Sequence, residues 1–177
     1  MLKTLRQIAS IGIVTEPAPH ADDSLRVRET LQENIRALLG RSLCIRHVDA
    51  GSCNGCELEI QALNNPLYNL EGLGIRFVAS PRHADLLLVT GPVSRHMEVA
   101  LRRTYAAASD PKLVVAVGDC GCTGGIFGES YASCGRVSNV IPVDVVIPGC
   151  PPSPTQLLRG ILAAISIGAQ SGTRLRR

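Results

Sequence analysis

Two short apolar runs restrict the fold of this chain more than any other feature of its sequence. Residues 85–90 read DLLLVT and residues 112–117 read KLVVAV, so both are almost wholly aliphatic. Runs of this length and composition are typical of strands that are buried on both faces. An amphipathic helical pattern at 94–108, with Ser94 as its expected N-cap, separates them, and parallel strands need a crossover of this kind. The sequence therefore predicts a parallel sheet with helices on its faces.

Further elements of the same kind flank these two strands. We expect strands at 43–48, 74–79 and 143–147, and helices at 27–39, 56–63 and 153–167. The last helix has the clearest start, because Ser153, Pro154 and Gln156 fit an N-cap, a first helical proline and a capping box. Ligands of such α/β sheets bind at the carboxyl ends of the strands, so we expect the functional site there.

The length of 177 residues suits one domain of ordinary size. The segment EPAPH at 16–20 has the composition of a turn or linker, so we expect residues 1–24 to form an amino-terminal extension. Residues 25–170 then form a single α/β domain, and residues 171–177 form a polar, basic tail.

Composition argues against several classes of protein. The net charge is only +3, the basic residues are scattered and aromatic residues make up 3%, so nucleic-acid binding has little support. No stretch approaches the roughly 18 uninterrupted apolar residues of a membrane span. Lys3, Arg6 and Gln7 interrupt the first apolar residues, so we expect no secretory signal. Without such a signal we expect a reducing compartment, where cysteines are more often metal ligands or catalytic groups than disulfides. The chain has seven cysteines, and this odd number also argues against a complete set of disulfides.

Three glycine-rich segments that directly follow predicted strands contain cysteines. Cys53 and Cys56 lie in GSCNGC after the first strand, Cys120 lies in GDCGC, and Cys150 lies in PGCPP after the last strand. In a parallel sheet these three loops emerge at the same edge, so the four thiols can meet. Glycine lets the backbone approach a metal cluster closely, and its N–H groups can then hydrogen-bond the sulfurs.

The residues alone favour an iron–sulfur cluster but leave two other interpretations open. Four cysteines can hold zinc, although structural zinc sites usually have a second close pair and Cys150 stands alone. A thioredoxin-like redox pair would use Cys53 and Cys56 but would leave Cys120 and Cys150 without a role.

Three further cysteines have no assigned place in this set. Cys44 lies inside a predicted strand, so we expect a small buried side chain. Cys134 lies in a loop, and the sequence indicates no partner for it. Cys122 is two residues from Cys120 and could compete for the same metal, but Cys120 stands closer to the strand end and is preferred.

Three segments resemble a known family. They are DAGSCNGCELEI at 49–60, SPRHAD at 80–85 and IPVDVVIPGCPP at 141–152. They resemble the small subunit of membrane-associated (group 4) NiFe hydrogenases of the formate hydrogenlyase type. The resemblance covers residues 43–166. The same superfamily includes the 20 kDa subunit of complex I, the respiratory NADH–quinone oxidoreductase.

The spacing of the first cysteine pair separates the two branches of this superfamily. The complex I subunit has two adjacent cysteines there, whereas Cys53 and Cys56 are separated by Asn-Gly as in the hydrogenases. The hydrogenase branch is therefore preferred. A complex I-like subunit that passes electrons to quinone is the alternative, and a zinc-stabilised assembly subunit without redox activity is a third hypothesis.

The resemblance implies a flavodoxin-like parallel sheet with helices on both faces. It also implies one 4Fe–4S cluster, proximal to a nickel–iron centre in a separate large subunit, with ligands Cys53, Cys56, Cys120 and Cys150. The chain would then be an electron-transfer subunit of an oxidoreductase complex. Its partners would be the large subunit, a ferredoxin-like iron–sulfur subunit and integral membrane subunits, which hold it on the cytoplasmic face of the cell membrane.

A few charged residues near these segments need an interpretation. Glu59 is expected to lie near the start of a helix, where the helix dipole favours a carboxylate. Glu57 has either the same role or a role in a proton route. Arg82 and His83 could line a subunit interface, but a solvated turn is preferred. Arg95 and His96 are expected in the first turn of a surface helix.

Overall fold

The computed structural model describes residues 2–11 and 21–170. Its centre is a sheet of five parallel strands in the order β2-β1-β3-β4-β5. The strands are β1 (Leu43–Asp49), β2 (Ile75–Phe77), β3 (Leu86–Thr90), β4 (Leu113–Val117) and β5 (Val145–Ile147). The predicted flavodoxin-like α/β fold is confirmed.

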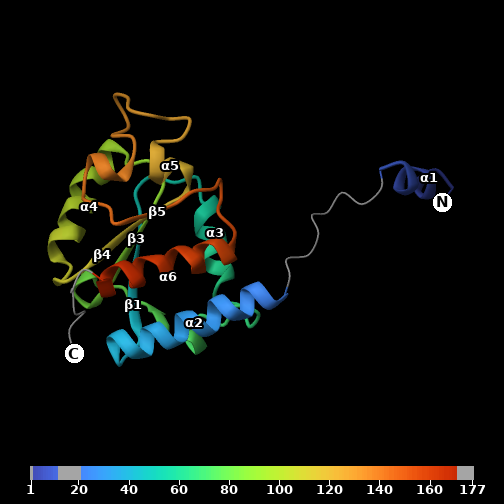
Figure 1. Cartoon of the computed structure of the whole chain (residues 1–177). Coiled ribbons are helices and arrows are strands. Elements are labelled where there is room, and N and C mark those ends of the chain that lie inside the picture. The colour runs from blue at the N-terminus through green and yellow to red at the C-terminus, as the bar shows by residue number, and fades with distance from the viewer. Residues whose placement is uncertain (1, 12–20, 171–177) are drawn as a thin grey trace.

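One long helix precedes the first strand, and helices follow β1, β3, β4 and β5 along the chain (Figure 1). They are α2 (Ala21–Leu39), α3 (Gly55–Ala62), α4 (Arg95–Ala107), α5 (Gly118–Thr123) and α6 (Pro154–Gln170). Three short 3-10 turns connect them: η1 (Glu71–Leu73), η2 (Pro81–His83) and η3 (Val137–Asn139). A further helix, α1 (Leu2–Ile11), lies in the expected amino-terminal extension, where the sequence patterns did not predict one.

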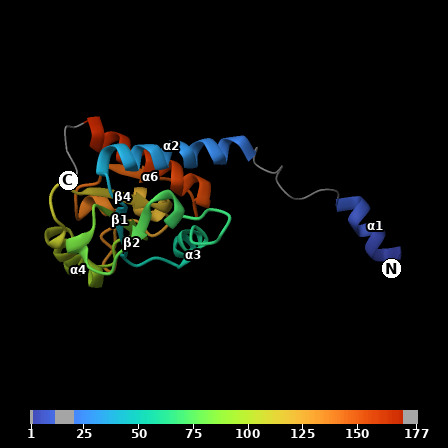
Figure 2. The ribbon, with the colours of Figure 1, turned by 90° about the horizontal axis from the view of Figure 1, so that it is seen from below.

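The sheet is buried on both faces, as its two central strands require. Leu86 and Leu88 of β3 pack in a core with α2, α3 and α6, while the alternate residues Leu87 and Val89 pack against α4 and η3. Figure 2 shows α2 and α6 on one side of the strands and α4 on the other. Both central strands are buried at every position, which explains their unbroken aliphatic sequences.

Several predicted element ends are confirmed in detail. The N–H of Ser153 donates to Oε1 of Gln156 at 2.7 Å, and the N–H of Gln156 donates to Oγ of Ser153 at 3.4 Å, which completes the capping box of α6. Oγ of Ser94 caps α4 by accepting the N–H of Met97 at 3.3 Å.

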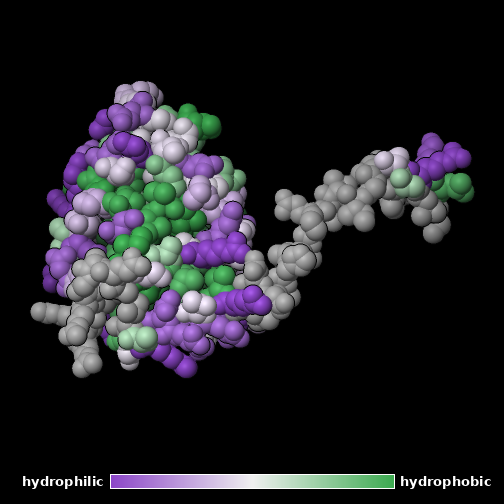
Figure 3. Space-filling model, viewed as in Figure 1, coloured by the Kyte–Doolittle hydropathy of each residue, from purple (hydrophilic) through white to green (hydrophobic). Residues whose placement is uncertain are grey.

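The face on which α6 lies carries a concentration of hydrophobic residues within a more polar rim (Figure 3).

Other predictions need correction. The predicted helix at 27–39 begins earlier, at Ala21. The strand expected at 74–79 is limited to Ile75–Phe77, so β1 continues beyond the end of its neighbour. The glycine-rich segment after β4 begins as the short helix α5 rather than as a loop. The expected basic tail, 171–177, lies outside the described residues. Among residues 2–11 and 21–170, no helix combines the length and the apolar composition that crossing a membrane requires.

Candidate metal centre

The four predicted ligands lie at the carboxyl edge of the sheet. Cys53 is in the loop after β1, Cys56 is in the first turn of α3, Cys120 is in α5 after β4, and Cys150 follows β5. Cys53 and Cys150 are exposed, whereas Cys56 and Cys120 are half-buried. The set therefore has an inner side against the domain and an outer side that faces solvent.

Electrostatics show that these thiols are neighbours. Burial, the Glu57 carboxylate and then the charges of Cys53, Cys120 and Cys150 raise the pKa of Cys56 to about 12. Burial and the charges of Cys150 and Cys53 likewise raise the pKa of Cys120. Four thiolates in one place repel one another, so this arrangement favours a positively charged metal group that would compensate them.

The loop that carries Cys53 is organised by Asp49 at the end of β1. One carboxylate oxygen, Oδ1, accepts the N–H groups of Gly51 and Ser52, each at 2.8 Å. Burial by itself raises the pKa of Asp49, but these two donors, the Ser52 side chain and the charge of His47 together leave the pKa below its ordinary value. Asn54 then takes a left-handed conformation, with φ of 72°, at the N-cap position of α3, where its side chain makes no capping hydrogen bond.

Helix α5, which carries Cys120, and the loop that carries Cys150 are joined directly. The N–H of Asp119 donates to the carbonyl of Gly149 at 2.9 Å. The N–H of Gly149 donates in return to Oδ1 of Asp119 at 2.8 Å. This reciprocal pair ties the start of α5 to the loop after β5, so two of the candidate ligands are held at a fixed separation.

Glycines make room for the sulfur atoms. A Cβ at Gly118, where φ is +79°, would lie 2.7 Å from Sγ of Cys56. A Cβ at Gly125, where φ is +56°, would lie 2.9 Å from Sγ of Cys120. Any side chain at either position would press on a candidate ligand, and the backbone conformation itself favours glycine. The residues present therefore fit a metal group that is ligated by these sulfurs and approached closely by the backbone.

A buried carboxylate lies beside this set. Glu57 is 8% exposed, and neither carboxylate oxygen has a hydrogen-bond partner among the described residues. Its Oε1 is 3.6 Å from Nε2 of His47, which is itself 3.0 Å from Oγ1 of Thr90. Burial lowers the pKa of His47, and Glu57 offsets part of that effect. Glu57 thus lies in the first turn of α3 and faces the interior of the domain.

The other cysteines make contacts elsewhere. The thiol of Cys122 lies 3.6 Å from the carbonyl of Ala116, and burial above all raises its pKa to about 11. The thiol of Cys134 donates to Oε2 of Glu98 at 3.4 Å, a partner that the sequence did not indicate. Cys44 is half-buried rather than buried, and its thiol lies 3.8 Å from the carbonyl of Ser42.

The remaining candidate residues lie apart from the four thiols. Arg82 and His83 form the exposed turn η2 before β3, at the amino edge of the sheet, as the preferred interpretation expected. Arg95 and His96 are exposed in the first turn of α4, also as expected. Glu59 is half-buried on α3.

Within residues 2–11 and 21–170, no three His, Cys, Asp or Glu side chains are placed to hold one ion between them.

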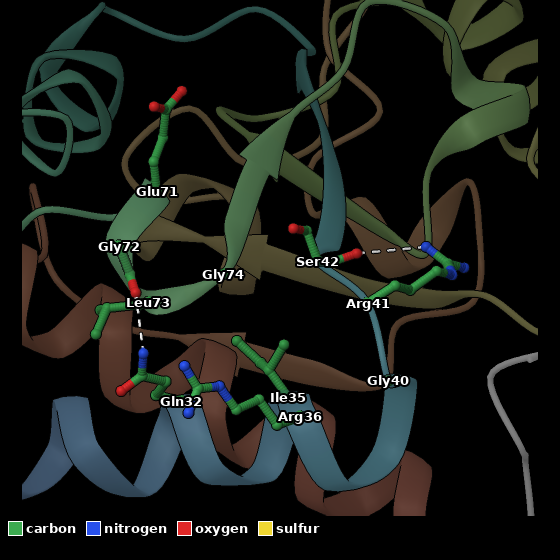
Figure 4. A pocket seen from close by; sticks show the side chains of 10 residues that line it. All are labelled: Gln32, Ile35, Arg36, Gly40, Arg41, Ser42, Glu71, Gly72, Leu73 and Gly74. Carbon is green, nitrogen blue, oxygen red and sulfur yellow. Dashed lines mark hydrogen bonds between the residues drawn. The ribbon is translucent and has the colours of Figure 1, made fainter.

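A pocket at the opposite edge of the sheet is separate from these cysteines. It has a volume of about 340 Å³ and lies between the end of α2, η1 and the segment before β1 (Figure 4). Inside it, Nε2 of Gln32 donates to the carbonyl of Gly72 at 3.1 Å. None of its lining residues is a cysteine, and it borders the amino ends of β1 and β2.

Comparison with known proteins places the chain in a family. The family model described as NADH ubiquinone oxidoreductase, 20 Kd subunit, matches residues 53–164, a range that includes all four candidate ligands. The chain belongs to this family. The resemblance drawn from the three sequence segments is thereby confirmed.

Individual relatives agree with this assignment. The probable membrane-bound hydrogenase subunit mbhJ of Pyrococcus furiosus is 44% identical over 141 residues, which cover 78% of this chain and 84% of that protein. Formate hydrogenlyase subunit 7 of Escherichia coli is 42% identical over 156 residues. That match covers 84% of this chain but only 61% of the relative, so the chain spans less than two thirds of its length.

A solved structure supports the same fold. A chain of the membrane-bound sulfane sulfur reductase, an archaeal respiratory membrane complex, superposes with a TM-score of 0.64 and 36% identity. The superposition covers 77% of this chain and 75% of the other.

Proposed function

We propose that this chain carries one 4Fe–4S cluster on Cys53, Cys56, Cys120 and Cys150. We propose further that it is the electron-transfer small subunit of a multisubunit, membrane-associated NiFe hydrogenase. The observation that carries the proposal is the meeting of four mutually repelling thiols at one edge of the sheet, packed against glycines. The cluster-binding unit is residues 25–170, with 1–24 as an extension and 171–177 as a tail.

The geometry favours this cofactor over the two alternatives. A redox pair of Cys53 and Cys56 does not account for the charges of Cys120 and Cys150 in its immediate surroundings. Structural zinc sites usually contain a second close pair of cysteines, whereas Cys150 stands alone in the sequence. The glycine backbone supplies close N–H groups, which tune iron–sulfur clusters in general.

Different residues of this chain would hold such a group and tune its properties. When bound, a 4Fe–4S cluster accepts and donates single electrons. Asp49 and Asp119 fix the loops of the ligands through backbone N–H groups. Glu57 places a buried negative charge next to Cys56. The apolar core beneath α3 and α6 excludes water from the inner side of the site.

The outer side of the site fits a subunit interface. Cys53 and Cys150 are exposed, and an exposed cluster would be open to solvent and oxidants unless another protein covered it. The relatives are named as subunits of membrane-bound hydrogenase and formate hydrogenlyase. We infer that the covering partner is a large subunit with the nickel–iron centre. A ferredoxin-like iron–sulfur subunit and integral membrane subunits would complete the complex at the cytoplasmic face of the membrane.

A second function is favoured by the family description itself. The model that matches residues 53–164 is named for a subunit of NADH–ubiquinone oxidoreductase, in which electrons pass towards quinone. The Asn-Gly spacer between Cys53 and Cys56 favours the hydrogenase branch.

Reduction of the cluster by hydrogen separates the two functions. We would purify the whole complex anaerobically, expose it to hydrogen or to a quinol, and follow the cluster by electron paramagnetic resonance. The proposal predicts a cluster signal under hydrogen that a Cys150→Ser variant lacks. A signal that appears with quinol and never with hydrogen would establish the quinone function instead.

A further inference from the structure

A cavity of about 270 Å³ lies where β2 ends beside β1. The two strands pair only as far as Ile45 and Phe77, while β1 continues to Asp49. The cavity occupies this open stretch of β1 and extends to α3. It is therefore built on the same two elements that lead to Cys53 and Cys56.

The polar wall of the cavity consists of side chains that can donate hydrogen bonds. Arg46 and His47 come from β1, Gln61 from α3 and Asn64 from the turn after it. None of the lining side chains is a carboxylate. The cavity thus presents a cationic guanidinium, an imidazole and two amides. Glu57 lies 3.6 Å from Nε2 of His47, but it does not line the cavity and makes no ion pair with Arg46.

Arg46 has an unmet requirement for an acceptor. Its Nε is buried and has no hydrogen-bond partner among the described residues, and no ion pair forms between Arg46 and any described carboxylate. A guanidinium can only donate, so a buried N–H without an acceptor is costly. By contrast, Arg28, whose Nε is also unpartnered, donates through Nη1 to the carbonyl of Leu67 at 3.0 Å.

The shape and chemistry of the cavity restrict the occupant. A planar guanidinium beside other donors matches the two oxygens of a carboxylate. The opposite wall is apolar, with Ile60, Phe77 and Val78, and suits a short methylene stem. The volume lies below the roughly 300–1,000 Å³ of typical small-molecule sites, which favours a single side chain over a cofactor.

We propose that this cavity receives an acidic side chain, Asp or Glu, from a partner subunit. The inference rests on the proposed membership of a complex but not on the identity of the metal group. Exposed Cys53 and the cavity lie at two places along the same β1–α3 unit, so a partner that covers the first can also reach the second. The occupant would bring the acceptor that Arg46 lacks and would fix the orientation of the partner on this chain.

Chemical coupling in the intact complex tests the proposal. In an R46K variant the new amine should stand next to the incoming carboxylate. A water-soluble carbodiimide activates the carboxylate, and the lysine amine then attacks it to form an amide. The carbodiimide gains the elements of water in this reaction and leaves as the corresponding urea. Mass spectrometry identifies the joined peptides. R76K is the matched control, because Arg76 is an exposed arginine on the neighbouring strand β2.

The expected result is an amide between position 46 and an Asp or Glu of another subunit, with none at position 76. In addition, R46Q should weaken retention of the partner during salt washes by at least about tenfold relative to R76Q, as expected when a buried charge pair loses one member. Iron content should stay at the wild-type level in all four variants. A negative result for the docking proposal can therefore be told apart from a negative result for the cluster proposal.

Other outcomes would overturn the partner assignment. The coupling is repeated with isotope-labelled succinate, and labelled succinate attached at position 46 would mean that the cavity takes a free carboxylate. Coupling to an acidic residue of this chain would mean that the occupant is internal. If position 46 couples no more than position 76 and R46Q binds its partner like wild type, the cavity is not a docking site.

Discussion

Asp119 and Gly149 exchange two backbone-anchored hydrogen bonds, of 2.9 and 2.8 Å, between α5 and the loop after β5. Each residue directly precedes a candidate ligand, Cys120 and Cys150 respectively. The pair therefore sets the distance between two sulfurs that come from different strands. Residues that hold a metal centre together are often found in such contacts behind the ligands rather than among the ligands themselves.

An Asp119→Ala variant should loosen the cluster without removing a ligand. Gly149 would lose the carboxylate that accepts its N–H, so the loop of Cys150 would move more freely. We expect iron release to an added chelator to be on the order of tenfold faster than in wild type. Asp110→Ala is the control, since Asp110 is 85% exposed and makes its ion pair with Lys112, away from the cysteines. Equal release from wild type and D119A would show that the contact is dispensable.

A Gly118→Ala variant should lower cluster occupancy more strongly. The new methyl group would lie 2.7 Å from Sγ of Cys56, and a contact that short must displace the sulfur or the backbone. Gly128→Ala separates this clash from backbone strain, because Gly128 also has a positive φ, +53°, but has no atom within 4 Å of an added Cβ. Iron and sulfide content per complex should fall in G118A and stay near wild type in G128A. A similar loss in both would assign the effect to the backbone conformation alone.

A Glu57→Gln variant should raise the midpoint potential of the cluster. The buried carboxylate next to Cys56 disfavours added negative charge, as its effect on the pKa of that thiol shows. Loss of one charge at this range should shift the potential by on the order of 50 mV. Redox titration followed by electron paramagnetic resonance measures the shift. Glu71→Gln, in the turn η1 at the amino edge, should leave the potential unchanged, and an equal or lower potential in E57Q would contradict the electrostatic account.

Asp85 should matter for stability and not for redox properties. It is buried at the amino edge, where it pairs with Arg41 and accepts the N–H of Cys44 at 2.9 Å. Asp85→Ala would leave that N–H without its acceptor, at a cost of about 2 kcal/mol. Arg41→Gln should cost less, about 0–1 kcal/mol, because Arg41 is half-exposed and water can replace it. Calorimetry on the complex compares the two, and a larger loss in R41Q would reverse this ranking.

The architecture could be predicted from the sequence because local composition shows which strands are buried. β3 and β4 are buried at every position, and their aliphatic runs predicted both the strands and the parallel sheet. Parallel topology then placed the loops of all four cysteines at one edge. The capping residues of α4 and α6 were likewise readable, since a cap depends on neighbours a few residues away.

Contacts between distant segments were not predictable in the same way. The exchange between Asp119 and Gly149 and the burial of Glu57 against His47 depend on how separate loops meet in space. The early end of β2, which opens the cavity at Arg46, also has no signal in local composition, because 74–79 reads as a complete strand. The assignment of Cys120 rather than Cys122 gained its physical support only when the thiol of Cys122 was found beside the carbonyl of Ala116.

The most direct test of the central claim is the iron and acid-labile sulfide content of the anaerobically purified complex, measured for wild type and for a Cys150→Ala variant. The account predicts that the variant lacks about four irons and about four sulfides relative to wild type, together with one paramagnetic cluster signal. Zinc bound at these cysteines without sulfide, or equal iron and sulfide in both proteins, would contradict it.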